Sequence, residues 1–429
     1  MNQKQKTILI MLLAVHLVLL YLVLSRNLDF LFNDASHRIG PGSDFWALYN
    51  AGKHWRLGDN IYMRGPGYGF RYHPIFAMTI LSYLSYLAHQ PAYWLWVAIN
   101  EIFLVMFLVV ARRMIVNTAH FLVACAVMVG FSPYYLEVYM GNASFIAAAV
   151  LLMAIYLLQR RAQLGAYITY LVSILIKPVG LALLPILLLR RRFATVFLTL
   201  VIIAGLALPY FIVHPNDWYD FARVNFEGFS TTPGFMVHGG NQGFYGLMVM
   251  ISAFANHVPT RELYNLTQFS DFSRILIRVI PYFFIAVSGL ATYRLRRTDN
   301  LYILVFLWSA TYLLGYKDVW EHSYAFLVLG LLMLYLSRAF DPRLLLILSG
   351  AIALPTLFAF YDIPMRSLGI SDPGWYWDFK TSLLHHATKP VFLLALYLLS
   401  LRKAFTGRVP NLPESGSSPM SIAGQQLSD

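Results

Sequence analysis

The longest polar stretch ahead of the C-terminal tail runs from residue 41 to residue 74 and contains a candidate general base. This residue is Asp44, which follows Ser43 and stands among aromatic side chains. A carboxylate within hydrogen-bond reach of a substrate hydroxyl can accept the proton that the hydroxyl loses as it attacks. The alternative is structural: Ser43 would cap a helix, and the charge of Asp44 would stabilise its first turn. A second acid, Asp59, lies in a Gly-Asp-Asn sequence typical of turns, which favours a structural role.

A lysine interrupts an apolar region farther along the chain. Residues 164–176 and 177–189 form two short apolar halves, and Lys177-Pro178 lies at their junction. Because proline ends or kinks a helix, we expect a hairpin of two helices with Lys177 at the break. An ionisable residue at membrane depth indicates a function by default. The alternative is a lysine whose stem lies along apolar surface while its charged end reaches water.

The composition indicates that membrane helices position these residues. Of the 429 residues, 59% are hydrophobic and only 12% are charged, whereas soluble domains contain about 25% charged residues. The net charge of +12 is concentrated in short basic loops between apolar runs, which is the pattern of cytoplasmic loops and excludes nucleic acid as a partner. The single cysteine, Cys125, excludes disulfides and cysteine-ligated metals. The sequence therefore predicts an all-α polytopic membrane protein.

The apolar runs and basic loops together predict about twelve crossings, with both termini in the cytoplasm. Besides the two halves of the hairpin, the expected spans are 7–25, 92–111, 119–138, 143–159, 194–213, 275–294, 300–316, 323–337, 343–360 and 388–402. Segments 74–88 and 243–255 are too short to cross and are expected to lie at the outer surface. The expected outer loops are 27–73, 214–242, 316–322 and 361–387.

The first outer loop is expected to contain a short helix lying in the membrane interface. Phe45, Leu48, Tyr49 and Gly52 share one helical face, with tryptophans beside it. At the other end of the chain, residues 406–429 are rich in Ser, Pro and Gly and are predicted to form a disordered cytoplasmic tail. The membrane-embedded domain is therefore expected to cover residues 1–405.

Short motifs in a constant order carry a resemblance to a known family. The first is Asp44-Phe45-x-x-x-Tyr49-x-Ala51-Gly52. The later ones are Gly58, Tyr62, Phe70-x-Tyr72-x-Pro74, Trp96, Gly141-Asn142, Lys177-Pro178, Arg190-Arg191-Arg192, Asn241-Gln242 and Trp320-x-His322. Over most of residues 40–340 this order resembles glycosyltransferase family 87. These type-C membrane enzymes include polyprenol-phosphate-mannose-dependent mannosyltransferases.

The resemblance implies the type-C glycosyltransferase fold and an inverting transfer. An acceptor hydroxyl would attack the anomeric carbon of a sugar, by resemblance mannose, that is carried on polyprenyl phosphate. Such a reaction needs one carboxylate as base and cations or hydrogen-bond donors around the departing phosphate. The resemblance assigns the base to Asp44. The expected substrate-binding residues are Arg71, Tyr72, Lys177, Asn241, Gln242, Lys317, Trp320 and His322.

Several of these residues also have structural interpretations. Arg71, between two aromatic residues, could be an interfacial anchor, and His322 could be an ordinary loop histidine. Asn241 and Gln242 could form a turn in their Gly-Gly-Asn-Gln sequence. Two histidines that match no motif are expected at the membrane interface: His385 and His386.

The expected partners are a polyprenyl-phosphate-linked sugar donor, a glycolipid or glycan acceptor, and membrane lipids. The expected location is the inner membrane, with the site facing the periplasm. No cofactor or metal is expected, because loop 27–73 lacks an Asp-x-Asp or Asp-x-Glu pair. Two other classes stay open. A flippase or transporter of lipid-linked sugar would need charged residues throughout the spans. A polymerase or ligase of lipid-linked glycans would need outer-loop arginines, for which Arg223 and Arg261 are candidates.

Overall fold

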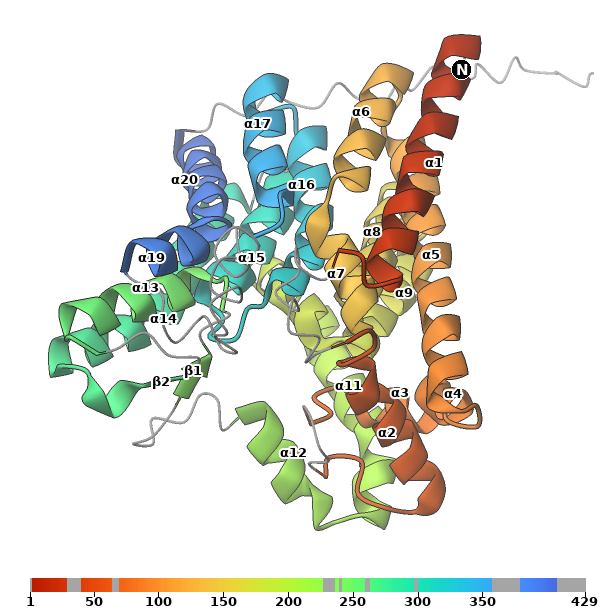
Figure 1. The fold of residues 1–429 in the computed structure, drawn as a ribbon, viewed down its shortest axis with the longest axis vertical. Helices are drawn as coiled ribbons and strands as arrows, with labels where there is room; N and C mark the ends of the chain where they lie inside the picture. Colours follow the sequence, from red (N-terminus) through yellow and green to blue (C-terminus); the bar gives the residue numbers. More distant parts are fainter. Residues whose placement is uncertain are drawn as a thin grey trace, which may run out of the picture.

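A computed structural model describes residues 2–28, 40–63, 69–226, 236–238, 241–258, 263–296, 300–356 and 379–406. These residues form a helical bundle (Figure 1). The exceptions to helix and loop are two short antiparallel strands, β1 (Met236–His238) and β2 (Leu263–Asn265). The predicted all-α class is confirmed.

Within the described part of the chain, five helical segments are long and apolar enough to cross a membrane. The expected first span is confirmed as such a helix, α1. The five are α1 (Gln3–Leu24), α5 (His89–Met114), α11 (Phe193–Val213), α14 (Asp271–Leu295) and Leu383–Thr406, which joins the end of α19 (Phe379–Ala387) to α20 (Pro390–Thr406).

A sixth candidate is a bent pair. The expected continuous span 119–138 consists of α6 (Thr118–Val129) and α7 (Ser132–Met140), which meet at 50°. Pro133 lies in the first turn of α7. Because proline lacks a backbone N–H and its ring clashes with the preceding turn, it favours a kink or a break at this point.

The other apolar helices are shorter, at 10–17 residues each. They are α3 (Pro74–Phe76) with η2 (Ala77–Leu81) and α4 (Ser82–Leu84), α8 (Ser144–Gln159), α9 (Gln163–Ile176), η3 (Pro178–Leu183) with α10 (Leu184–Leu189), α13 (Phe244–Ala255), α15 (Leu301–Gly315), η6 (Glu321–Phe326) with α16 (Leu327–Leu336), and α17 (Pro342–Ala353). The predicted break at Lys177-Pro178 is present. The count of about twelve crossings stays a prediction.

Helix α2 (Phe45–Leu57) confirms the expected amphipathic helix after Asp44. The four residues predicted to share one face, Phe45, Leu48, Tyr49 and Gly52, are all buried. A β-carbon at Gly52 would lie 2.2 Å from the carbonyl oxygen of Leu81. Glycine at this position therefore allows α2 to pack directly against the backbone of η2.

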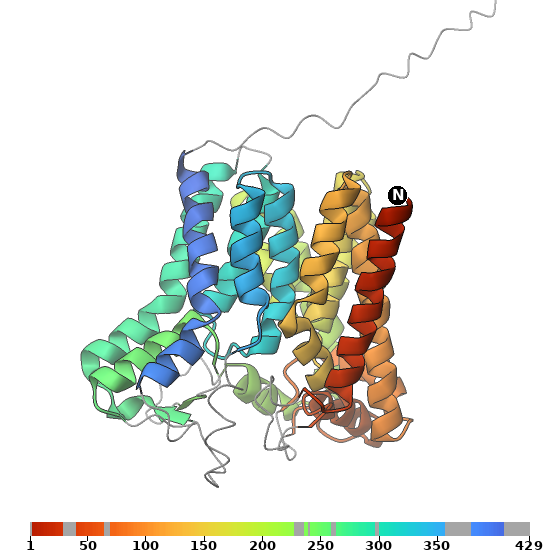
Figure 2. The same cartoon turned by 45° about the horizontal axis from the view of Figure 1, so that its top comes forward.

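The two ends of the bundle differ in content (Figures 1 and 2). Helices α2 and α12 (Asp217–Phe226) lie at one end, whereas the N-terminus of α1 and the start of α6 lie at the other. Three of the expected outer loops contain α-helices, which are α2, α12 and α19. Helix α17 ends at Ala353, before the predicted residue 360, because Pro355 disfavours helical backbone in the residue that precedes it. Arg261, the tail from residue 407, and residues 357–378 lie outside the described residues.

Candidate active site

Asp44 lies at the start of α2, but its side chain does not cap that helix. Its Oδ2 accepts a hydrogen bond of 2.8 Å from Nδ2 of Asn142 instead. The backbone is fixed by the end of α7, where the N–H groups of Gly42 and Asp44 donate to the carbonyls of Tyr139 (2.7 Å) and Met140 (2.9 Å). The structural interpretation of Asp44 as a helix-start residue therefore does not account for the direction of its carboxylate.

The surroundings of Asp44 favour its protonated form more than water does. The side chain is 14% exposed. Burial raises the pKa of Asp44 above its ordinary value, while the hydrogen bond from Asn142 and the charges of Lys177 and Arg71 act in the opposite direction. A carboxylate with a raised pKa holds a proton more strongly, which suits a general base.

Asn142 reaches Asp44 because of the glycine that precedes it. Gly141 ends α7 with a φ of +75°, in the left-handed region that favours glycine. A β-carbon at this position would lie only 2.6 Å from the Cβ of Phe45. The close contact between the end of α7 and the start of α2 thus requires glycine, and it places the next side chain beside the carboxylate.

The amide of Asn142 joins four other side chains, and we call the five residues the Asp44 cluster: Asp44, Tyr72, Asn142, Lys177 and His322. The Oδ1 atom of Asn142 accepts from Nζ of Lys177 (2.5 Å) and from the hydroxyl of Tyr72 (3.1 Å). Its Nδ2 lies 2.8 Å from Asp44 Oδ2 and 3.2 Å from Nε2 of His322.

The chemistry of lysine determines which way this amide points. An ammonium group only donates, so the Asn142 oxygen must face Lys177 and the nitrogen must face Asp44 and His322. Nε2 of His322 then accepts from Asn142 and carries no proton. This Nε2 atom also lies 3.5 Å from Asp44 Oδ2. The side-chain nitrogen of Asn142 therefore contacts both Asp44 and His322.

Lys177 is directed into the protein and not toward a membrane surface. Its Nζ donates to Oγ of Ser144 (2.5 Å) as well as to Asn142, and its charge acts on the carboxylates of Glu137 and Asp44. Glu137 is fully buried, and its Oε1 accepts from the backbone N–H groups of Ser144 and Phe145 at the start of α8. The snorkelling interpretation of Lys177 is therefore wrong for this structure.

Arg71 lies at the exposed side of the Asp44 cluster. Its Nη1 pairs with Oδ2 of Asp318 at 3.0 Å, and the two side chains are 43% and 26% exposed. Both charges act on Asp44. Arg71 thus has a defined position next to the cluster, and its side chain is partly exposed.

Asn241 and Gln242 are buried against the segment that leads from Lys317 to His322. Asn241 donates to the carbonyl of Lys317 and accepts from the N–H of Gly243 (2.8 Å), which matches the predicted turn. The backbone carbonyl of Gln242 accepts a hydrogen bond from the hydroxyl of Tyr324 (2.8 Å), and its backbone N–H donates to the carbonyl of Val319 (2.6 Å). These bonds hold the segment that contains Lys317 and Trp320 and leads to His322.

Helix α19 and the start of α20 contribute buried polar groups that the sequence did not lead us to expect. His385 and His386 are 1% and 2% exposed, so both are buried within the protein, and their expected position at the membrane interface stays a prediction. Nε2 of His385 lies 2.6 Å from Nε2 of Gln242. Lys389 is fully buried and pairs with Oε1 of Glu321 at 3.1 Å. Glu321 directly precedes His322, so this ion pair anchors the backbone that presents His322 to Asp44.

The structure therefore brings four of the sequence-predicted residues together around Asn142: Asp44, Tyr72, Lys177 and His322. Arg71 lies next to them, and the other predicted residues belong to the segments 241–242 and 317–320. Asn142 and Glu137 were not predicted as site residues. Asn142 belongs to the Gly141-Asn142 motif, but its side chain is neutral and did not indicate a role in the site. Glu137 is an ionisable residue inside an apolar run, and this could have marked it as a functional residue. Among the described residues, no group of three or more His, Cys, Asp or Glu side chains gathers as metal ligands would.

Comparison with known proteins identifies the family. No curated protein sequence matches the chain. A family model described as glycosyltransferase family 87 matches residues 70–317, which is more than half of the 429 residues and includes Tyr72, Asn142 and Lys177. The chain is a membrane protein by its apolar helices and a glycosyltransferase by this match. It belongs to glycosyltransferase family 87.

Proposed function

We propose that this glycosyltransferase is an inverting enzyme that transfers mannose from polyprenyl phosphate to a hydroxyl of a glycolipid or glycan. The observation that carries the proposal is the carboxylate of Asp44. It is buried, does not cap its helix, and is held by Asn142 beside the cations Lys177 and Arg71. One oriented base with cations nearby is the set of groups that this transfer needs.

In the proposed mechanism, Asp44 accepts the proton of the acceptor hydroxyl as the hydroxyl oxygen attacks the anomeric carbon. The bond between that carbon and the phosphate oxygen breaks, and polyprenyl phosphate leaves with the electron pair. Attack on the face opposite the departing phosphate inverts the configuration. Asn142 orients the carboxylate and does not react itself. The Asp44 carboxyl must then release its proton before the next turnover.

The phosphate requires positive charge rather than an acid, because it leaves already ionised. Lys177 and Arg71 are the proposed phosphate ligands, with Lys177 held at the break between α9 and η3 and Arg71 at the exposed side. Lys317, Tyr72 and His322 complete the proposed donor site. Asn241, Gln242 and Trp320 are proposed to contact the sugar or to hold the segment that does.

The proposed setting is the inner membrane, with about twelve crossings and the Asp44 cluster facing the periplasm. The basic pair Arg112-Arg113 supports this orientation. Helix α5 begins at His89, whose ring packs 5.6 Å from that of Phe45, and it ends with these two arginines. At 1.5 Å per residue the helix is about 39 Å long, so the basic pair lies at the end away from Asp44.

The test is to incubate purified protein with a panel of polyprenyl-phosphate sugars and a glycolipid acceptor, and to measure the release of polyprenyl phosphate. Release from the mannose donor, together with a product of inverted anomeric configuration, is the expected result. Transfer from a nucleotide sugar in place of the lipid-linked donors, or a retained configuration, would contradict the proposal.

A further inference from the structure

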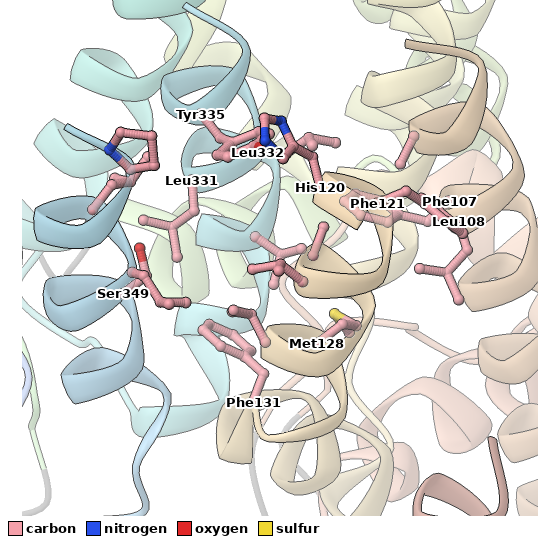
Figure 3. A pocket seen from close by; sticks show the side chains of 18 of the residues that line it. Phe107, Leu108, His120, Phe121, Met128, Phe131, Leu331, Leu332, Tyr335 and Ser349 are labelled. Atoms are coloured by element: carbon pink, nitrogen blue, oxygen red, sulfur yellow. The ribbon is translucent and has the colours of Figure 1, made fainter. Parts of the chain in front are cut away.

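A lateral cavity of about 240 Å³ lies between α6 and the pair α16–α17, with residues of α5 as its floor. Figure 3 shows the side chains that line it, with Tyr335 and His120 toward one end and Phe131 and Met128 toward the other. Eleven residues separate His120 from Phe131, and at 1.5 Å per residue the cavity runs along about 16 Å of helix. That is about half of the ~30 Å hydrocarbon core, the depth of one leaflet.

The lining is apolar apart from a few polar groups. The polar lining residues are His120, Tyr335, Arg343 and Ser349. An apolar cavity does not hold water, and an empty one leaves its lining without packing partners. In a membrane protein, the material that can fill a lateral apolar groove is hydrocarbon.

Basic groups lie around the end of the groove where α6 and α17 begin. Arg343, in the first turn of α17, is exposed, and its backbone N–H donates to Asp341. His120, in the first turn of α6, packs edge-on against Tyr335 at 5.8 Å. The guanidinium of Arg112 lies 5.7 Å above the ring of Phe121, which also lines the cavity. A hydrocarbon groove with cationic groups at its rim is complementary to a lipid with an anionic headgroup.

We propose that this groove binds one membrane phospholipid, with an acyl chain between α6 and α17 and the phosphate at Arg343 and His120. The position of the groove argues for a phospholipid over the polyprenyl-phosphate donor. Phe45 packs against α5 as far along as Trp96, which is about 27 Å along the helix from Met114 at 1.5 Å per residue. Helix α6 starts just after that end of α5, so a sugar on that headgroup could not reach Asp44. Binding of a phospholipid does not require the proposed function, whereas the exclusion of the polyprenyl-phosphate donor rests on it.

Binding at this place stabilises the bundle because the lipid joins two parts of it. Phe131, at the inner end of the groove, precedes Ser132, whose hydroxyl donates to Oε1 of Glu321 at 2.8 Å. The lipid would fill the remaining space between α6 and the α16–α17 pair on the other side of this contact. Occupancy should therefore raise the unfolding temperature of the full-length protein.

The test uses the full chain purified in a phosphate-free detergent, with native mass spectrometry and thermal unfolding before and after phosphatidylglycerol is added. Ala124→Phe and Ser349→Phe each fill the groove, and Arg343→Gln removes the rim cation. Arg192→Gln is the matched control, because Arg192 is an exposed arginine that does not line the groove. It follows the hairpin of α9 and η3–α10, which starts and ends at the same end of the bundle as Arg343. Size exclusion and far-UV circular dichroism show whether the filled variants fold.

We expect the wild type and Arg192→Gln to retain one phospholipid and to unfold several degrees higher when it is added. The filled variants should lose the bound lipid, and Arg343→Gln should bind it about tenfold more weakly, as expected for one charged hydrogen bond. Equal retention by folded groove-filled variants would overturn the proposal. So would equal binding of diacylglycerol, which lacks the phosphate, or preferential binding of polyprenyl phosphate. If both filled variants fail to fold, unchanged affinity in Arg343→Gln is sufficient to overturn it.

Discussion

The role of Asn142 can be tested by removing its amide. In Asn142→Ala, the Asp44 carboxylate loses its 2.8 Å donor, and Lys177 and Tyr72 lose the oxygen that holds them at 2.5 and 3.1 Å. The side chains of all three can then rotate away from the positions that the Asp44 cluster gives them. We therefore expect a loss of catalysis without a change in the nature of the base.

The magnitude follows from the charged hydrogen bonds that disappear. A hydrogen bond to an ionised group contributes about 1.5–3 kcal/mol. If one such contribution is lost from transition-state stabilisation, kcat/KM falls about 10- to 150-fold. The pH profile should change as well. The bond from Asn142 lowers the pKa of Asp44, so its loss raises that pKa further. The base must be ionised to act, and the acid limb of kcat/KM therefore moves to higher pH.

The assay is transfer from polyprenyl-phosphate mannose, measured as kcat/KM between about pH 4 and 9 so that both limbs are covered. Asn100→Ala is the matched control, because Asn100 is also a buried asparagine but donates only to the carbonyl of Trp96 within α5 among the described bonds. It should retain the wild-type profile. An Asn142→Ala enzyme with wild-type kcat/KM, or with an acid limb at lower pH, would refute the reasoning.

Three further predictions concern the donor site, the anchor of η6 and metal use. Lys177→Ala should raise the KM for the lipid-linked donor, and unchanged KM and kcat would reject its role as a phosphate ligand. Glu321→Gln leaves the buried ammonium of Lys389 without its charged partner and should destabilise the protein by about 3–5 kcal/mol. Thermal unfolding measures this, with Asp271→Asn as control, because the exposed pair Asp271–Arg274 should contribute about 0–1 kcal/mol. Activity should persist after EDTA treatment, and recovery of a lost activity by added divalent metal would contradict metal independence.

Patterns that are local in the chain predicted much of the fold. The break at Lys177-Pro178 and the buried face of α2 follow from one proline and from helical spacing, and both are present. The 50° bend between α6 and α7 was missed although Pro133 marks it, because the apolar run continues through it. Hydrophobicity alone cannot distinguish a straight span from a bent one.

The candidate site was only partly predictable for a related reason. Asp44 and Lys177 are charged residues in unusual surroundings, so residue type alone draws attention to them. Asn142 is neutral, and its importance depends on the left-handed turn at Gly141 that places it against α2. The pair of Glu321 with Lys389 joins segments far apart in the chain, and no local pattern indicates such a contact.

The most direct test of the account compares two aspartates of the same polar stretch. In Asp44→Asn, the new amide oxygen can still accept the hydrogen bond from Asn142, but the side chain can no longer accept a proton. Asp59→Asn alters a half-exposed residue whose partner is His54, 3.4 Å away. The account predicts that Asp44→Asn loses transfer by about 10²–10⁴-fold while donor binding and thermal stability stay near wild type, and that Asp59→Asn remains active. Wild-type transfer by Asp44→Asn would contradict the assignment of the base.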